Sequence, residues 1–208
     1  GRGFGSYVQK KGGEAVLIGR DNRVSSKGYE ESFIAGLLST GCNVYDAGLV
    51  TSPMIYFGLR NYQIPAAVMV TGSHNPPTMN GFKLCYGDSA IAGPEIQKIK
   101  EIIEHGVFYT GKGELFKKDV IKDYAEYFKK HFNFKKSFKV VVDGGNSVGG
   151  YLNVPILTAL GLNVLPLYCD LDGTFPNHFP DPTVVENNRD LIKWVLSKKF
   201  DLGIGYDG

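Results

Sequence analysis

Long apolar runs, paired cysteines and a strong excess of one charge are all missing from this sequence of 208 residues. No apolar stretch approaches the roughly 20 residues that span a bilayer, and no signal peptide opens the chain. The net charge of +2 is too small to indicate nucleic-acid binding. These absences favour a cytoplasmic protein that binds neither a membrane nor a nucleic acid.

Cysteine is scarce, and no two cysteines show the C-x-x-C spacing of a metal or redox site. Cys42, Cys85 and Cys169 are odd in number, widely separated and flanked by apolar or strand-forming residues. We therefore expect buried free thiols in a reducing compartment, without disulfides or zinc. Lysines are plentiful between residues 117 and 139, and we interpret them as the solvated face of a helix.

Strand-like and helix-like segments alternate along the chain. Expected strands cover residues 15–19, 43–45, 66–70, 82–86, 139–143, 164–167 and the last apolar run into Tyr206. Expected helices cover 28–40, 52–62, 94–105, 119–132, the stretch up to Leu160, and 191–199. The alternation predicts an α/β fold of two α/β/α layered domains with mixed, largely parallel sheets. Because a second series of alternating helices and strands begins near residue 119, we place the domains at 1–118 and 119–208.

Both ends of the sequence look cut. Gly1 to Val8 show neither a helix cap nor a turn, and the chain stops at Asp207-Gly208, directly after a strand. Since α/β proteins place ligand sites at such strand tips, we expect the second domain to be truncated.

The loop T-G-S-H-N-P-P at 71–77 carries the strongest chemical signal. Its two prolines exclude a helix, and Gly72 allows backbone conformations that other residues avoid. The loop therefore holds the Ser73 hydroxyl stiffly at a strand end, beside the imidazole of His74 and the carboxamide of Asn75. A serine assisted by a base or a cation is a nucleophile, whereas an unassisted one belongs to a plain polar turn.

A serine hydrolase is the obvious alternative, but its nucleophile lies in a G-x-S-x-G turn. Here Asn75 stands two residues after Ser73, and a proline replaces the start of the helix that should follow. A second glycine-rich turn, V-V-V-D-G-G-N-S-V-G-G at 140–150, lacks both the G-x-G-x-x-G spacing and the Walker lysine. It either cradles a phosphate on its amides or packs a strand closely against a helix.

Taken together, the motifs resemble those of the α-D-phosphohexomutase family, and most closely its bacterial phosphomannomutase/phosphoglucomutase members. The matching segments follow one another along the whole chain: G-R-D-N-R-V-S-S at 19–26, T-G-S-H-N-P-P-T-M-N-G-F-K at 71–83, V-V-D-G-G-N at 141–146, D-G-T-F-P-N-H-F-P-D-P at 172–182 and D-L-G-I-G-Y-D-G at 201–208. The serine-loop form resembles that of members acting on both mannose and glucose phosphates.

The resemblance implies a role for each candidate residue. Ser73 corresponds to the serine that carries the phosphoryl group, His74 to a residue lining it, and Lys83 to a lysine that stabilises charge or moves a proton. Asn75 and Arg20 are expected to bind phosphate. Asp207 corresponds to the first carboxylate of a loop that binds Mg²⁺ together with an oxygen of Ser73.

The implied reaction interconverts hexose 1-phosphates and hexose 6-phosphates. Phosphoserine donates to a sugar hydroxyl, a hexose 1,6-bisphosphate forms and reorients, and its other phosphate returns to the serine. The expected partners are a phosphosugar and the missing C-terminal domains of the same chain, because the family's third and fourth domains are absent.

Three departures from the family pattern affect these expectations. The N-terminal Y-D-I-R-G segment is absent, the metal loop stops after Asp207, and Ser147 stands where a glycine is usual. We therefore expect the 208 residues by themselves to be inactive. A non-catalytic module that binds phosphosugars or nucleotides remains the alternative from another functional class.

Overall fold

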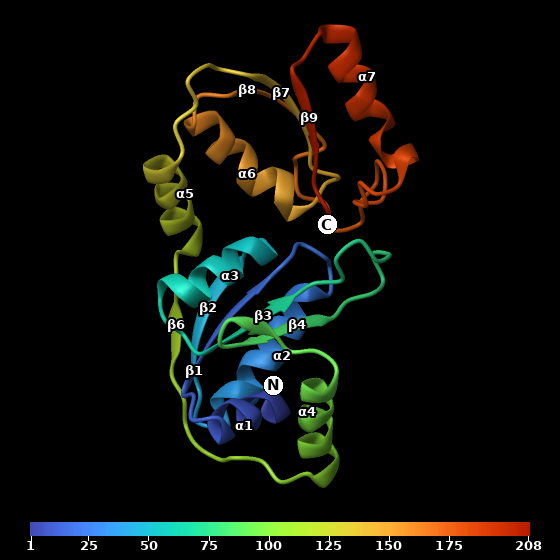
Figure 1. Cartoon of the computed structure of the whole chain (residues 1–208). Coiled ribbons are helices and arrows are strands. Elements are labelled where there is room, and N and C mark those ends of the chain that lie inside the picture. Colours follow the sequence, from blue (N-terminus) through green and yellow to red (C-terminus); the bar gives the residue numbers. More distant parts are fainter. The chain divides into compact units, whose positions relative to one another are not determined.

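The computed structural model describes all 208 residues and divides into two compact units. The first unit contains residues 1–20, 25–71 and 81–120, and the second contains 21–24, 72–80 and 121–208. Each unit is built around its own β-sheet, with helices beside it (Figure 1). The helices are all too short or too polar to cross a membrane.

The sheet of the first unit is mixed and largely parallel. Its strands are β1 (Ala15–Arg20), β2 (Asn43–Leu49), β3 (Ala66–Val70), β4 (Phe82–Tyr86), β5 (Ser89–Ala90) and β6 (Leu115–Lys117). Their order is β5-β4-β3-β1-β2-β6, and only β4 and β5 run antiparallel to their neighbours. The central strands are continuous runs of apolar residues because helices cover both of their faces.

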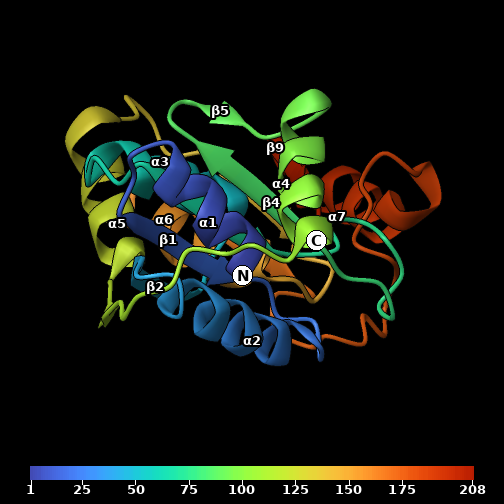
Figure 2. The ribbon, with the colours of Figure 1, turned by 90° about the horizontal axis from the view of Figure 1, so that it is seen from below.

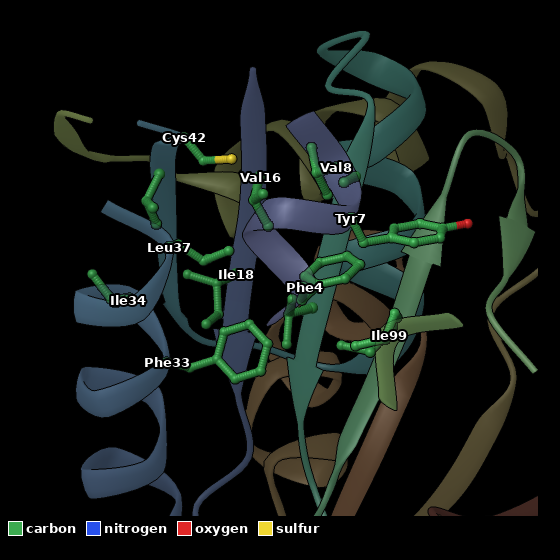
Figure 3. Close-up of a cluster of buried hydrophobic side chains, with 14 of the residues drawn as sticks. Phe4, Tyr7, Val8, Val16, Ile18, Phe33, Ile34, Leu37, Cys42 and Ile99 are labelled. Atoms are coloured by element: carbon green, nitrogen blue, oxygen red, sulfur yellow. The ribbon is translucent and has the colours of Figure 1, made fainter. Parts of the chain in front are cut away.

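Three helices share one face of this sheet: α1 (Arg2–Lys10), α2 (Ser26–Leu38) and α4 (Pro94–His105). Their buried side chains, among them Phe4, Phe33 and Ile99, join Val16 and Ile18 of β1 in a single core (Figure 3). Seen from below in Figure 2, α1 and α4 cross in front of the sheet, and α2 runs along the bottom of the view. Helix α3 (Ser52–Asn61) covers the other face, completing three layers.

Side chains of β1 point alternately to the two faces of the sheet, which explains this layering. Val16 and Ile18 point to the core under α1 and α2, so Leu17 and Gly19 must point the opposite way. A Cβ on Gly58 of α3 would lie 2.7 Å from Leu17, and one on Gly19 would lie 2.9 Å from Ile55. Glycine at both positions therefore allows α3 to approach the strand closely.

Helix α1 was not predicted, since Gly1 to Val8 carry no recognisable helix signal. Two glycines lower its helix propensity, but both are needed for packing. A Cβ on Gly3 would lie 2.4 Å from Ile103, and one on Gly5 would lie 2.3 Å from Thr40. Burial of the α1 side chains therefore overrides local propensity. The short strands β5 and β6 were missed as well.

The second unit has a parallel sheet of order β8-β7-β9. Its elements are α5 (Val120–His131), β7 (Lys139–Asp143), α6 (Val148–Ala159), β8 (Asn163–Leu167), the 3₁₀ helix η1 (Val185–Asn188), α7 (Arg189–Lys198) and β9 (Leu202–Gly205). Val140 and Val142 share a core with Leu157 of α6, whereas Gly203 lies against Leu191 of α7. Helices thus cover both faces, and the expected α/β/α fold class is confirmed for each unit.

Free thiols are confirmed, although their burial is not uniform. Cys42 and Cys85 are buried, and Cys169 is half-buried, so the expectation of full burial was wrong for Cys169. Burial nevertheless raises the pKa of the Cys169 thiol to about 11. All three thiols are unpaired, as expected.

The glycine-rich turn after β7 lets helix α6 pack closely against the end of the strand. The amides of residues 144–147 donate to Leu167 O, Asp143 Oδ1, Tyr168 O and Gly144 O, so none of these four is left to hold a phosphate. A Cβ on Gly150 would lie 2.5 Å from the Cα of Gly144 and 2.8 Å from the sulfur of Cys169. Of the two interpretations, the structure therefore favours close contact between strand and helix.

The close contact between Gly150 and Gly144 predicts how substitution of Gly150 affects stability. Gly150→Ala should lower the free energy of unfolding by about 1–3 kcal/mol, because overpacking outweighs the helix propensity that alanine gains. Gly28→Ala in α2 is the matched control, since a Cβ there meets nothing within 4 Å. It should stabilise the protein by roughly 0.5–1 kcal/mol. Urea unfolding measures both, and equal effects of the two variants would contradict the packing explanation.

Candidate active site

The loop of residues 72–80, here called the serine loop, belongs to the second compact unit. Its amide of Asn75 donates to Gly72 O at 3.0 Å, and that of Met79 donates to Pro76 O at 2.9 Å. Ser73 has a φ of +53°, in the left-handed region that residues other than glycine seldom occupy. Such strained backbone is typical of functional sites, where the surroundings enforce it.

Asp207 lies beside the serine. The Ser73 hydroxyl donates to Asp207, with Oγ 3.2 Å from Oδ1 and 3.5 Å from Oδ2. The Nδ1 of His74 lies 3.3 Å from Oδ2 of the same carboxylate. The side chains of His74 and Asp207 are 50% and 48% exposed, so a ligand from solvent can reach both.

Two backbone hydrogen bonds fix the position of Asp207 after β9. The amide of Tyr206 donates to Asp143 O at 3.0 Å, continuing the sheet, and the amide of Gly208 donates to Pro180 O at 2.9 Å. Asp207 is therefore held between two anchored neighbours at the carboxyl end of a parallel strand. Open α/β sheets bind their ligands at this edge.

The donor atoms at this position suit a hard cation in part. The carboxylate of Asp207 and the hydroxyl of Ser73 are oxygen ligands of the kind that Mg²⁺ prefers, but Mg²⁺ needs six oxygens. No group of three or more His, Cys, Asp or Glu side chains that could hold a metal occurs in the structure. The remaining ligands would have to come from water, from a substrate phosphate or from residues outside these 208.

The predicted site residues are divided between the two units. Ser73, His74 and Asp207 come together, and Asn75 follows in the same loop with an exposed side chain. Arg20 belongs to the first unit, where its Nε donates to Glu30 at 2.9 Å. Lys83 also belongs to the first unit, as an exposed residue of β4 that faces Met69 of β3.

Sequence reasoning missed Arg23, whose side chain is fully buried in the second unit. Its Nε donates to Asp21 at 3.1 Å, and its terminal nitrogens donate to backbone carbonyls of the serine loop. The available signals were its place in the matching segment 19–26 and an Asp two residues before it, in a loop between a strand and a helix. That spacing does not reveal where the guanidinium points.

His178 is a structural residue of the second unit. Its Nε2 lies 3.0 Å from Oδ1 of Asp143, which is buried at the end of β7. This hydrogen bond raises the pKa of His178 above its ordinary value of 6.5, partly offset by desolvation. Protonated His178 is therefore stabilised in the fold.

The raised pKa of His178 predicts how stability depends on pH. Its contribution is fully present below the unfolded pKa of about 6.5 and is lost as pH rises through the higher folded pKa. The free energy of unfolding of the wild type, minus that of His178→Gln, should therefore decrease between about pH 5.5 and pH 8.5. Urea unfolding at both pH values gives this difference. A difference that stays constant with pH would contradict the ion pair.

Comparison with known proteins places the chain in a family. Residues 1–110 match the phosphoglucomutase/phosphomannomutase α/β/α domain I, and residues 122–208 match domain II of the same family. The chain therefore belongs to the phosphoglucomutase/phosphomannomutase family.

The similar proteins carry consistent names. The chain is 40% identical over 208 residues to a phosphomannomutase/phosphoglucomutase of Pseudomonas aeruginosa, which it covers to 45%. It is 38% identical over 210 residues to a phosphoglucomutase of Neisseria meningitidis serogroup B, covered to 46%. Both alignments include 100% of this chain.

A solved structure agrees with these relatives. The crystal structure of a phosphoglucomutase/phosphomannomutase family protein from Burkholderia thailandensis matches with a TM-score of 0.95 and 37% identity. The match covers 100% of this chain and 47% of the other. The chain thus spans a little under half the length of the proteins that it matches.

Proposed function

We propose that these 208 residues are the first two domains of a phosphohexomutase that interconverts hexose 1-phosphates and hexose 6-phosphates of mannose and glucose. The observation that carries the proposal is the short distance, 3.2 Å, between the hydroxyl of Ser73 and the carboxylate of Asp207. The strained backbone of Ser73 supports it further. The domains are proposed to divide at about residue 118, with the remaining domains supplying sugar and distal phosphate binding.

In this proposal the Ser73 oxygen carries the phosphoryl group. When a hexose monophosphate binds, its free hydroxyl attacks phosphorus, the P–O bond to Ser73 breaks, and a hexose 1,6-bisphosphate forms. The bisphosphate reorients, and its other phosphate returns to Ser73 while the sugar oxygen leaves. The proton of the attacking hydroxyl passes to a base and is given back in the second half-reaction.

Other residues are proposed to support the transfer. His74 and Lys83 stabilise negative charge or move the proton, and Arg20 and Asn75 bind phosphate. Asp207 and Ser73 would supply two oxygen ligands to Mg²⁺, which neutralises charge on the transferring group when bound. The three free thiols support a reducing cytoplasm as the site of action.

The proposal is tested by mass spectrometry of the full-length protein that contains this segment. Incubation with glucose 1,6-bisphosphate and Mg²⁺ should add one phosphate that peptide mapping assigns to Ser73. Ser73→Ala should take up none, because it lacks the hydroxyl that lies beside Asp207. Ser25→Ala is a control at a serine outside the serine loop, and it should be phosphorylated on Ser73 like the wild type.

The competing function is a module that binds phosphosugars without chemistry. It predicts that glucose 1,6-bisphosphate binds, as calorimetry would detect, while no phosphate appears on Ser73. That combination of results would replace the mutase proposal with the binding module.

A further inference from the structure

Arg23 is a completely buried charged residue of the second unit. The proposed chemistry does not explain its contacts. Its side chain is 0% exposed, and its ion-pair partner Asp21 is 2% exposed. Burying a cation this completely is costly unless every donor finds an acceptor. The arrangement of its partners therefore indicates what the residue does.

All of the guanidinium N–H groups are used. Nε donates to Oδ2 of Asp21 at 3.1 Å. One terminal nitrogen donates to Pro76 O at 2.7 Å and Met79 O at 3.1 Å. The other donates to Asn75 O at 2.8 Å and to Ser73 O. Because arginine has five such hydrogens, no donor is left for a substrate or a phosphate.

The acceptors apart from Asp21 all come from the serine loop. The loop therefore folds its carbonyl groups inward around one cation, and the carbonyl of Ser73 itself is among them. Since the Ser73–His74 peptide is trans, its amide points away from the guanidinium. The same contact restrains the rotation about the Cα–C bond of Ser73, next to its left-handed φ of +53°.

Gly72 and Phe175 pack against the guanidinium of Arg23. A Cβ on Gly72 would lie 2.7 Å from Cζ of Arg23, so glycine is needed where the loop passes the guanidinium. The ring of Phe175 lies on another side, with its centroid 5.2 Å from Cζ. Only a planar group with donors in a fixed fork fits this space and reaches these carbonyls together.

We propose that Arg23 is the positioning residue of the serine loop. It touches no reacting atom, but it holds Ser73 in the strained conformation that presents the hydroxyl to Asp207. The proposal has two parts. The geometric part, that Arg23 orders the serine loop, does not depend on the proposed function. The chemical part, that this order speeds phosphorylation, rests on the proposed function, since it requires that Ser73 carry a phosphoryl group.

Hydrogen exchange of the 208-residue chain tests the geometric part. In Arg23→Lys the charge remains, but an ammonium has three donors and cannot span the carbonyls. We expect the exchange of amides in residues 72–80 to accelerate at least about tenfold more than that of amides in 139–150, which report only the loss of stability of the whole unit. A merely structural role would accelerate both segments together. Unchanged exchange in 72–80 would overturn the proposal, as would a uniform acceleration.

Arg60→Lys is the matched control, because Arg60 is an exposed arginine that pairs with Asp88 at 3.1 Å. It should leave both segments unaffected. If Arg23→Lys does not fold, NMR of the wild type decides. The guanidinium protons of Arg23 should exchange with solvent at least about a hundredfold more slowly than those of Arg60. Equal rates would overturn the proposal.

The chemical part is tested in the full-length protein. The rate of Ser73 phosphorylation by glucose 1,6-bisphosphate should fall at least about tenfold in Arg23→Lys, with unchanged affinity for the sugar bisphosphate. Loss of affinity without loss of rate would overturn the positioning role. A wild type that takes up no phosphate would reject the proposed function instead, while the exchange experiment would still decide whether Arg23 orders the loop.

Discussion

Asp207→Asn is expected to slow the phosphorylation of Ser73 by about 10²–10³-fold in the full-length protein at a fixed Mg²⁺ concentration. The substitution keeps the shape of the side chain and an oxygen that can accept the Ser73 hydrogen bond. It removes the negative charge that faces the serine at 3.2 Å. A neutral carboxamide attracts Mg²⁺ far less than a carboxylate does, so the transferring phosphoryl group would lose charge compensation.

The measurement is the initial rate of phosphate incorporation at several Mg²⁺ concentrations. The variant should need more Mg²⁺ than the wild type, whereas its free energy of unfolding should stay the same because Asp207 is half-exposed. Asp172→Asn is the matched control, an exposed carboxylate of the same unit whose partner is Thr174. A wild-type rate for Asp207→Asn at every Mg²⁺ concentration would remove Asp207 from the proposed site.

Local sequence signals predicted most of the fold. The apolar runs that became β1, β3 and β7 are buried strands covered on both faces, so their composition alone marks them. Helix α1 escaped because its two glycines act through distant contacts with Ile103 and Thr40. A propensity pattern contains no information on such contacts.

The candidate site was predictable only in part, for a related reason. The prolines of the serine loop announce a rigid turn, but Ser73 and Asp207 are separated by 134 positions and meet only in the folded unit. Resemblance to a family, not spacing, suggested that pairing. The role of Arg23 was hidden altogether, because its acceptors are backbone carbonyls and every residue has one.

Arg23→Met should lower the free energy of unfolding of the second unit by about 3–5 kcal/mol. Methionine fills much of the space, so the loss comes mainly from electrostatics. The Asp21 carboxylate, 2% exposed, would remain buried without its partner, and four carbonyls of the serine loop would lose their donor. Unpaired buried charge is among the few causes of an effect this large.

A double-mutant cycle separates the charge from the carbonyls. Asp21→Asn combined with Arg23→Met removes both charges, so the pair should cost less than the sum of the single substitutions by about 1–3 kcal/mol. Urea unfolding supplies the four free energies. The loss that remains in the double variant belongs to the carbonyls, because neither new side chain replaces the guanidinium as their donor. Strict additivity would mean that Asp21 and Arg23 act independently, and the buried pair would then have no part in holding the serine loop.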